Sequence, residues 1–202
     1  MKKLTCLLLA CLLALSLTAC GTPKTETLDI FAMDTYMSLV AVGDGAFDVL
    51  QQTANEINTL EQRLSRTIDT SDVARLNADG TAALSGDTTA LLRSALQYSA
   101  ETDGAFDVTI APLVALWGIT TDSPRVPSQA EIDAGGIAKG YASDKAAELF
   151  AGSGISGGFV SLGGNVYVHG ITAEGKPWNV AIQDPRNTEA YACTLHLSDA
   201  FV

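Results

Sequence analysis

The sequence predicts a single mixed domain of the α+β class, and three observations carry this prediction. The chain has 202 residues, of which 47% are hydrophobic, so it can bury a substantial core. Apolar residues recur at helical spacing in some stretches and form strand-like runs in others. These stretches are mixed without a regular βαβ alternation, which favours an α+β architecture.

The first residues have the pattern of an export signal. Two lysines precede the apolar run 4–17, which is short for a membrane span but suits a secretory signal. The run ends at a small residue followed by Cys20, which is similar to a bacterial lipobox. The resemblance implies a lipoprotein signal peptide over 1–19, lipid attachment at Cys20 and a lipid-anchored tether over 20–27. An ordinary signal peptide with a chance cysteine is the alternative.

The charge and the cysteines narrow the partners and the compartment. Asp and Glu outnumber Lys and Arg by 23 to 12, so we expect no nucleic-acid partner. Cleavage before Cys20 would leave 183 residues with a net charge of −13 and one unmodified cysteine, Cys193. We then expect no intramolecular disulfide and no cysteine-based metal site. The resemblance to a lipobox implies that the chain belongs to the bacterial cell envelope, lipid-anchored to the membrane on the extracytoplasmic side.

The first half of the domain contains one expected strand and two expected helices. Residues 28–42 are rich in Ile, Phe, Tyr and Val and predict a strand. Apolar residues at helical spacing predict an amphipathic helix over 45–64. A second helix is expected to start at Asp87 as its cap and to run through Leu96.

The second half contains a third helix and several strands. Residues 139–150 place alanines, Leu149 and Phe150 on one helical face. Residues 159–168 and 178–183 read as strands with a turn over 170–177 between them. A further strand is under way at 199–202.

One glycine-rich stretch matches a nucleotide-binding pattern only superficially. Residues 152–157 read Gly-Ser-Gly-Ile-Ser-Gly, a literal GxGxxG. The dinucleotide fingerprint requires a strand before the glycines and a helix after them, so that the phosphate meets a helix N-terminus. Here the helix comes first, so we interpret this stretch as a turn.

Three other stretches are candidate ligand sites. Residues 103–107 combine glycine, Phe106 and Asp107, which either present a surface to a flat polar ligand or form a tight turn with Phe106 in the core. Residues 133–140 lead glycines into a helix, where backbone amides and Lys139 favour an anion, and Asp133 is a candidate acceptor. A capping turn with a solvated lysine is the alternative there. The glycines of 161–165 indicate a bulge or a close backbone contact.

Together, in this order, these and other stretches resemble the ApbE-type flavin transferases, which are FAD:protein FMN transferases of bacterial envelopes. The resemblance covers nearly all of 29–202 and implies a partial flavin transferase domain over 28–202. The stretches that carry it are Ala32-Met33-Asp34-Thr35, Leu64-Ser65-Arg66-Thr67, Gly104-Ala105-Phe106-Asp107, Trp117-Gly118, the run 133–144, Leu162-Gly163-Gly164-Asn165 and Asp184-Pro185.

The resemblance implies an activity and a set of site residues. FMN would be transferred from FAD to a Thr hydroxyl of an acceptor flavoprotein, with release of AMP and with Mg²⁺ as cofactor. Such a cation neutralises charge that builds on the phosphate oxygens. The carbonyl of Gly136 would match one Mg²⁺ ligand. Thr67 stands where the family often has an aromatic residue. The residues expected to contact FAD are Met33, Thr67, Ala105, Phe106, Asp107, Asp133 and Lys139.

The sequence departs from the family pattern in two places. The family's remaining Mg²⁺ ligands lie beyond a Thr-Ser-Gly turn for which this sequence has no counterpart after Val202. Residues 126–132 look like the start of a helix capped by Ser128, yet they join Asp133 directly, where the family has a longer segment. Such a loss is expected to expose apolar surface and a sheet edge.

Two other functions remain open on the sequence. The chain could be a non-catalytic FAD-binding envelope lipoprotein, which would retain FAD without turnover. It could also be a metal-dependent FAD pyrophosphatase, which would release AMP without an acceptor protein.

Overall fold

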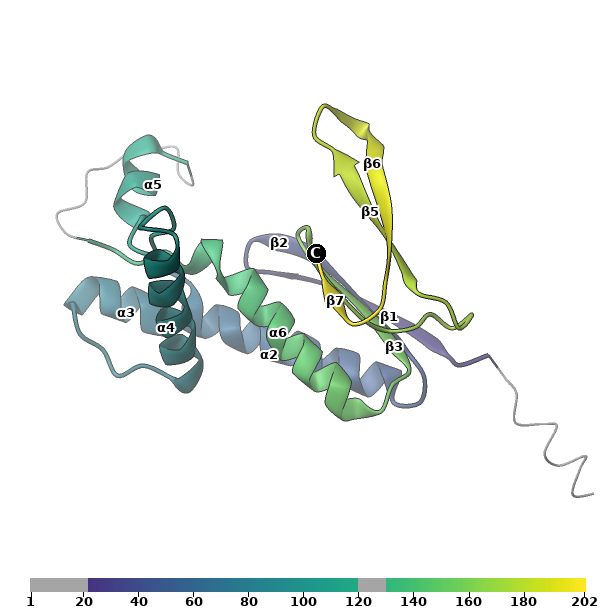
Figure 1. The fold of residues 1–202 in the computed structure, drawn as a ribbon. Coiled ribbons are helices and arrows are strands. Elements are labelled where there is room, and N and C mark those ends of the chain that lie inside the picture. Colours follow the sequence, from purple (N-terminus) through teal and green to yellow (C-terminus); the bar gives the residue numbers. More distant parts are fainter. Residues whose placement is uncertain (1–21, 120–129) are drawn as a thin grey trace, which may run out of the picture.

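The computed structural model describes residues 22–119 and 130–202 (Figure 1). The expected signal peptide, the lipid site Cys20 and the expected helix cap Ser128 lie outside these residues. Within the described ranges, no helix combines the length and apolar character needed to cross a lipid bilayer. The domain contains both helices and antiparallel strands, as the sequence predicts.

Five strands form the central sheet, in the order β1-β2-β3-β4-β7, with every neighbouring pair antiparallel. β5 and β6 form a separate two-stranded ribbon. Valines of β4 and β5 pack the ribbon onto the sheet in a small second core. The bounds are β1 Thr25–Ala32, β2 Thr35–Val42, β3 Gly157–Leu162, β4 Asn165–Gly170, β5 Trp178–Asp184, β6 Asn187–Leu197 and β7 Ala200–Phe201.

Two stretches expected as continuous strands are hairpins instead. Residues 28–42 fold back at Met33 and Asp34, which have φ angles of 50° and 56°. Residues 159–168 fold back at Gly163 and Gly164, with φ angles of 59° and 98°. Two-residue hairpin loops favour positive φ, which glycine adopts readily and other residues rarely do. The first turn lacks glycine, so the residue pattern did not reveal it.

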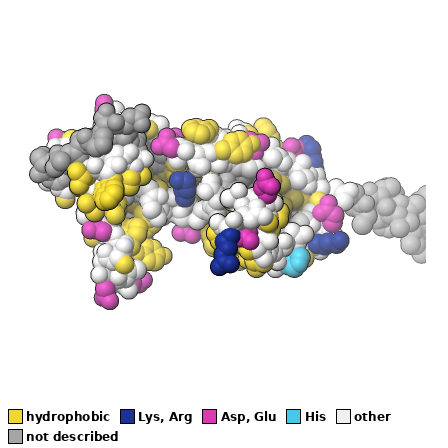
Figure 2. All heavy atoms as spheres, turned by 90° about the horizontal axis from the view of Figure 1, so that it is seen from above, with side chains coloured by type: hydrophobic (Ala, Val, Ile, Leu, Met, Phe, Trp, Pro, Cys, Tyr) yellow, Lys and Arg dark blue, Asp and Glu magenta, His cyan; other side chains and the backbone are white. Residues whose placement is uncertain are grey.

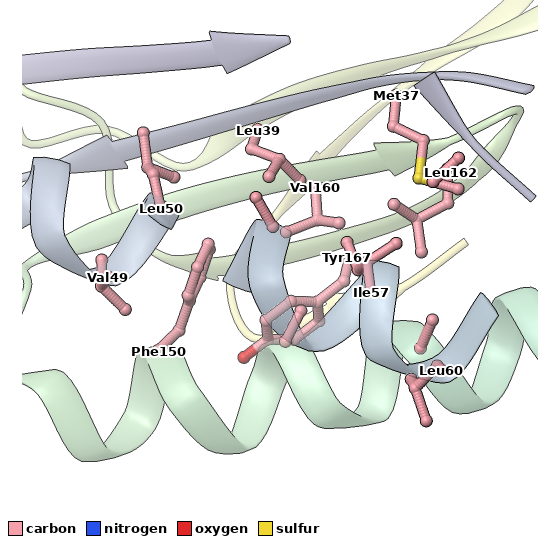
Figure 3. Close-up of a cluster of buried hydrophobic side chains, with 14 of the residues drawn as sticks. Met37, Leu39, Val49, Leu50, Ile57, Leu60, Phe150, Val160, Leu162 and Tyr167 are labelled. Atoms are coloured by element: carbon pink, nitrogen blue, oxygen red, sulfur yellow. The ribbon is translucent and has the colours of Figure 1, made fainter. Parts of the chain in front are cut away.

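Helices α2 (Ala46–Leu64) and α6 (Ala138–Ser153) lie side by side on one face of the sheet (Figure 1). Both were expected, within a few residues of these bounds. Figure 3 shows the core between the helices and the sheet, where Leu50 and Phe150 face Leu39 and Val160. This packing fixes the C-terminal end of α2 and the start of α6 against the same end of the sheet.

Three further helices gather at one end of the molecule, namely α3 (Asp72–Asp79), α4 (Gly86–Glu101) and α5 (Ala111–Trp117) (Figure 1). The expectation that Asp87 caps α4 is wrong, because Ser85 is the N-cap and accepts from the Thr88 amide. Ser85 thus supplies the oxygen that the first turn needs. The Asp87 carboxylate instead pairs with Arg63 and accepts a hydrogen bond from Tyr141 at 3.1 Å.

The other strand expectations hold. The strand over 178–183 is β5, and the strand under way at 199–202 is β7. Residues 152–157 run from the end of α6 into β3, with Gly154 as a left-handed C-cap. The literal GxGxxG therefore lies on a helix-to-strand turn, as expected. The long strand β6 was not predicted.

Candidate functional site

A cavity of ≈ 460 Å³ lies where four segments of the chain meet. This volume is within the range of small-molecule sites. The segments are the β1–β2 turn, the end of α2 with the residues after it, the stretch that leads into α6, and the β3–β4 turn. The lining residues are Met33, Asp34, Thr35, Glu61, Leu64, Ser65, Arg66, Thr67, Asp133, Ala134, Gly135, Ala138, Lys139 and Gly163.

The cavity brings together four of the residues expected to contact FAD, namely Met33, Thr67, Asp133 and Lys139. From Met33 to Lys139, their positions span more than 100 residues of the sequence. The shared lining therefore forms only when the chain folds, and four of the stretches that carry the family resemblance (32–35, 64–67, 133–144 and 162–165) contribute to it.

Asp133 is held by two contacts of its carboxylate. Oδ1 accepts the Gly135 amide at 2.9 Å and caps a short 3₁₀ helix, η2 (Ala134–Gly136). Oδ2 lies 3.3 Å from Nε of Arg66, and each of these two side chains is 19% exposed. An ion pair that is mostly shielded from water is screened less than a surface pair. The carboxylate is thus oriented and charge-balanced at the cavity wall.

The backbone before Asp133 is anchored by α3 and by the loop after α4. The Asn77 side chain donates to the carbonyl of Ile132 at 2.9 Å and accepts its amide at 2.6 Å. The amide of Asp133 donates to the carbonyl of Val108 at 2.9 Å. Asp133 itself has an extended backbone, with φ −126° and ψ 110°. The direct join before Asp133 is therefore accommodated without backbone strain at this residue.

Lys139 lies in the first turn of α6, whose N-terminal end faces the cavity. The free amides of a helix start and a neighbouring ammonium group both attract an anion. Tyr141, on the same helix, is tied to Asp87 of α4. Burial raises the pKa of Tyr141, and the Asp87 carboxylate raises it further, so the hydroxyl stays protonated and keeps donating.

Thr67 and Met33 belong to two turns at the cavity rim. The amide and the hydroxyl of Thr67 both contact Oγ of Ser65, at 3.2 and 3.0 Å. The amide of Met33 donates to Oε1 of Glu61 at 2.8 Å. Short side-chain-to-backbone bonds of this kind fix a local backbone conformation.

Ala105, Phe106 and Asp107 do not line the cavity. Phe106 is half-buried and packs edge-on to Tyr98, outside both core clusters, so it is not a core residue. A Cβ on Gly136 would stand 3.2 Å from the Phe106 ring, so the ring rests on η2. The Asp107 carboxylate accepts the amide and hydroxyl of Thr109, and these bonds lower its pKa. This loop thus contacts η2 through Phe106 without lining the cavity itself.

Two lining residues, Glu61 and Arg66, were not singled out from the sequence. Glu61 lies on α2, where the apolar residues recur at helical spacing. The sequence pattern therefore predicts that Glu61 belongs to the solvent-facing side of this helix. Arg66 directly precedes Thr67 in one of the stretches that carry the family resemblance. This position was the only feature of the sequence that pointed to Arg66 as a site residue. Neither the pairing of Arg66 with Asp133 nor the bond of Glu61 to Met33 has a counterpart in local sequence pattern.

The described residues do not provide a complete magnesium site. Within residues 22–119 and 130–202, no group of three or more His, Cys, Asp or Glu side chains is placed to hold a metal ion. Gly136, expected to supply one carbonyl ligand, lies in η2 behind the lining residues. Mg²⁺ requires near-octahedral oxygen coordination, usually with carboxylates. One carbonyl does not meet that requirement.

The surface of the domain carries scattered charges and several apolar patches. On the face shown in Figure 2, acidic and basic side chains are dispersed among the others, and one of the hydrophobic patches lies at the α5 end. Four large apolar side chains at or after α5 are exposed, namely Leu113, Leu116, Trp117 and Ile119. Exposed apolar surface at this place agrees with the segment expected to be missing after α5.

The fold is of the α+β class and contains a cavity of the size that small-molecule sites have. Its family follows from comparison with known sequences. The model of the ApbE family matches residues 33–135 and 128–202, so this chain belongs to the ApbE family.

Individual relatives agree with this assignment. The FAD:protein FMN transferase of Salmonella typhimurium is 34% identical over 133 residues, covering 49% of this chain. That of Haemophilus influenzae is 28% identical over 232 residues, covering 93% of this chain. The matched parts are 38% and 67% of those relatives' own lengths.

Solved structures share the fold. The ApbE protein of Thermotoga maritima superposes with a TM-score of 0.79 at 25% identity, covering 88% of this chain and 69% of the other. The flavin transferase ApbE of Vibrio cholerae gives a TM-score of 0.75 at 21% identity, covering 88% and 70%. The chain thus has the mixed architecture of the ApbE flavin transferases.

Proposed function

We propose that this chain binds FAD in the cavity and transfers FMN from it to a Thr hydroxyl of an acceptor flavoprotein, releasing AMP. The observation that carries the proposal is the convergence of Met33, Thr67, Asp133 and Lys139 on one cavity. The names of the Salmonella and Haemophilus relatives, FAD:protein FMN transferase, support the same reaction.

In this reaction the Thr oxygen attacks the phosphorus of the FMN half of FAD. A new P–O bond forms to the threonine, the anhydride P–O bond breaks, AMP leaves with the bridging oxygen, and the threonine proton passes to solvent. Lys139 and the start of α6 would hold the anionic diphosphate, and Asp133 would accept from a ligand N–H or hydroxyl. Thr67 and Met33 would position the rest of the ligand at the rim.

Mg²⁺ dependence is part of the proposal only through the family resemblance. The described residues offer no group of three or more His, Cys, Asp or Glu side chains placed to hold a metal ion, so we assign no step of the reaction to a metal held by them.

The test is incubation of the purified chain with FAD, excess Mg²⁺ and a candidate acceptor protein. Covalent flavin on the acceptor, seen as in-gel fluorescence, together with an equal amount of AMP supports the proposal. AMP released without acceptor would indicate a pyrophosphatase. The matched control is the same reaction with the acceptor's Thr changed to Ala, which should carry no flavin.

A second candidate is a non-catalytic FAD-binding lipoprotein. The observation that favours it is the contrast between four converging FAD candidates and an incomplete metal donor set. It predicts retention of FAD through gel filtration with no AMP release under any metal condition. Loss of retained FAD in Lys139→Ala, without turnover in the unsubstituted chain, would single it out.

We also propose that the chain is anchored by lipid on Cys20 at the extracytoplasmic side of a bacterial membrane. The basic start, the apolar run 4–17 and the small residue before the cysteine support this. Metabolic labelling with a fatty-acid analogue should mark the chain and not Cys20→Ala, whereas Cys193→Ala should be labelled normally. Equal labelling of the Cys20 variant would contradict the proposal.

A further inference from the structure

The β1–β2 turn carries Met33 to the cavity in a backbone conformation that its residues disfavour. Met33 and Asp34 have φ angles of 50° and 56°, in the left-handed region. A two-residue loop of this kind normally contains Asn, Asp or Gly, with Gly in at least one position, because a Cβ crowds the backbone there; Met33 is an unusual residue for it. Such strain persists only where the surroundings hold it, and it concentrates at functional sites.

Glu61 is the described side chain that hydrogen-bonds this turn. Its Oε1 accepts the Met33 amide at 2.8 Å. Glu61 lies in the last turn of α2, between Leu60 and Leu64, which are both buried in the core. The helix is therefore a rigid support, and the carboxylate fixes the turn to it. Met33, Asp34 and Glu61 all line the cavity.

The other side of the turn is closed by the β3–β4 turn. A Cβ on Gly163 would stand 2.5 Å from Oγ1 of Thr35, which directly follows Asp34. The β1–β2 turn thus lies between the end of α2 and the backbone of Gly163. Gly163 packs against the turn but makes no hydrogen bond to the Met33 amide. The hydrogen bond that fixes the direction of this amide therefore comes from Glu61.

We propose that Glu61 is a positioning residue that holds the strained turn in the conformation in which Met33 lines the cavity. The inference rests on the proposed binding of FAD in that cavity. Glu61 acts through the backbone of Met33 and not through its charge. A glutamine at this position retains an oxygen that can accept the same amide, whereas alanine does not.

The test measures the FAD dissociation constant by flavin fluorescence for the full chain and for Glu61→Gln, Glu61→Ala, Asp34→Gly and the double variant Glu61→Ala/Asp34→Gly. Glu61→Ala should weaken binding about tenfold, as loss of one restraining hydrogen bond predicts. Glu61→Gln should stay within about threefold of the unsubstituted chain. Asp34→Gly removes the steric cost of the turn, so the double variant should recover most of the loss.

Glu56→Ala removes an identical side chain elsewhere on α2 and should bind FAD normally. If the unsubstituted chain binds no FAD, the proposed function fails. If it binds FAD but Glu61→Ala binds equally well, or Glu61→Gln is as weak as Glu61→Ala, or Asp34→Gly gives no recovery, the positioning role is overturned. Should Glu61→Ala not fold, Glu61→Leu, which fills the same space but cannot accept the Met33 amide, takes its place in each of these comparisons.

Discussion

At the scale of single residues, the most informative contact is the ion pair between Arg66 and Asp133. Both side chains line the cavity and are largely shielded from water, and Asp133 also accepts the Gly135 amide. Arg66 therefore compensates a carboxylate that would otherwise repel an anionic nucleotide. Arg66 thus both orients the Asp133 carboxylate and balances its charge.

Arg66→Ala should weaken FAD binding about tenfold, because Asp133 loses its cationic partner and the cavity becomes more negative. The loss should be smaller for riboflavin, which carries no phosphate. Isothermal titration with both ligands measures the difference. The exposed Arg93→Ala on α4 is the charge-matched control, and equal losses for both ligands would show that Arg66 acts only by orienting Asp133.

Asp72 is a second residue whose charge the fold stabilises. Its side chain is buried between α3 and α4, pairs with Arg75, and accepts bonds from the Ser85 amide and the Thr88 hydroxyl at 2.8 and 2.7 Å. Burial alone would raise the pKa of Asp72, but these hydrogen bonds outweigh it and lower the pKa from 3.8 to about 2. The ionised form is therefore the one that supports the fold.

Because the folded-state pKa is below the unfolded value, the stabilisation is complete above pH 3.8 and is lost as the pH falls towards 2. Asp72→Ala should lower the free energy of unfolding at pH 7 by about 2 kcal/mol, and by much less near pH 2. Urea unfolding at both pH values measures this. Asp79→Ala, exposed at the end of the same helix, should change stability little, and a pH-independent loss in Asp72→Ala would contradict the assignment.

At the scale of elements, α3 serves the site although it does not line it. Its residue Asn77 clamps both backbone groups of Ile132, directly before Asp133. The short helix thereby connects the cavity wall to the helical end of the molecule. An element that looks peripheral in the ribbon thus sets the position of a candidate ligand contact.

Asn77→Asp should be more damaging than a simple loss of contact, because it places an acceptor opposite the Ile132 carbonyl while keeping the acceptor for its amide. We expect stability to fall by about 1–2 kcal/mol and FAD binding to weaken several-fold. Thermal unfolding and fluorescence titration provide the two readouts. Asn58→Ala on the exposed side of α2 is the control, and loss of stability with unchanged FAD affinity would separate the helix from the site.

At the scale of the whole molecule, this chain is internally shorter than its relatives. The Haemophilus alignment spans 232 positions, whereas 93% of this chain is about 188 residues, so about 44 positions have no counterpart here. The two family-model matches meet at residues 128–135, where the sequence joins Asp133 directly. A parallel bridge between Ile110 and Glu131 accommodates this join.

The potential metal ligands among the described residues predict how FAD affinity depends on Mg²⁺. Because the described residues contain no group of three or more His, Cys, Asp or Glu side chains placed to hold a metal ion, FAD affinity should change less than about twofold between EDTA and excess Mg²⁺. Fluorescence titration under both conditions measures this, with Ca²⁺ as the ionic-strength control. A tenfold or larger gain specific to Mg²⁺ would mean that the chain assembles a metal site from residues outside the described ranges.

Much of this organisation was visible in the sequence, and the misses have identifiable causes. The amphipathic helices were found because burial on one face imposes a 3.6-residue period. The first hairpin was missed because Met33 is a poor turn residue and no glycine accompanies Asp34, and the Met33 amide is held by Glu61 from a distant helix. The cap of α4 was misplaced by two residues because Ser85 and Asp87 are both good capping residues.

The sequence by itself determined the α+β class, the two helices of the core and the family. Hydrophobic periodicity and the order of motifs along the chain can be recognised without knowing which segments contact one another. Only the tertiary structure decided that Glu61 holds Met33, that Arg66 pairs with Asp133, and that the Phe106 ring rests on Gly136. Those contacts join segments tens of residues apart. They depend on how α2, α6 and the sheet pack, which no local pattern encodes.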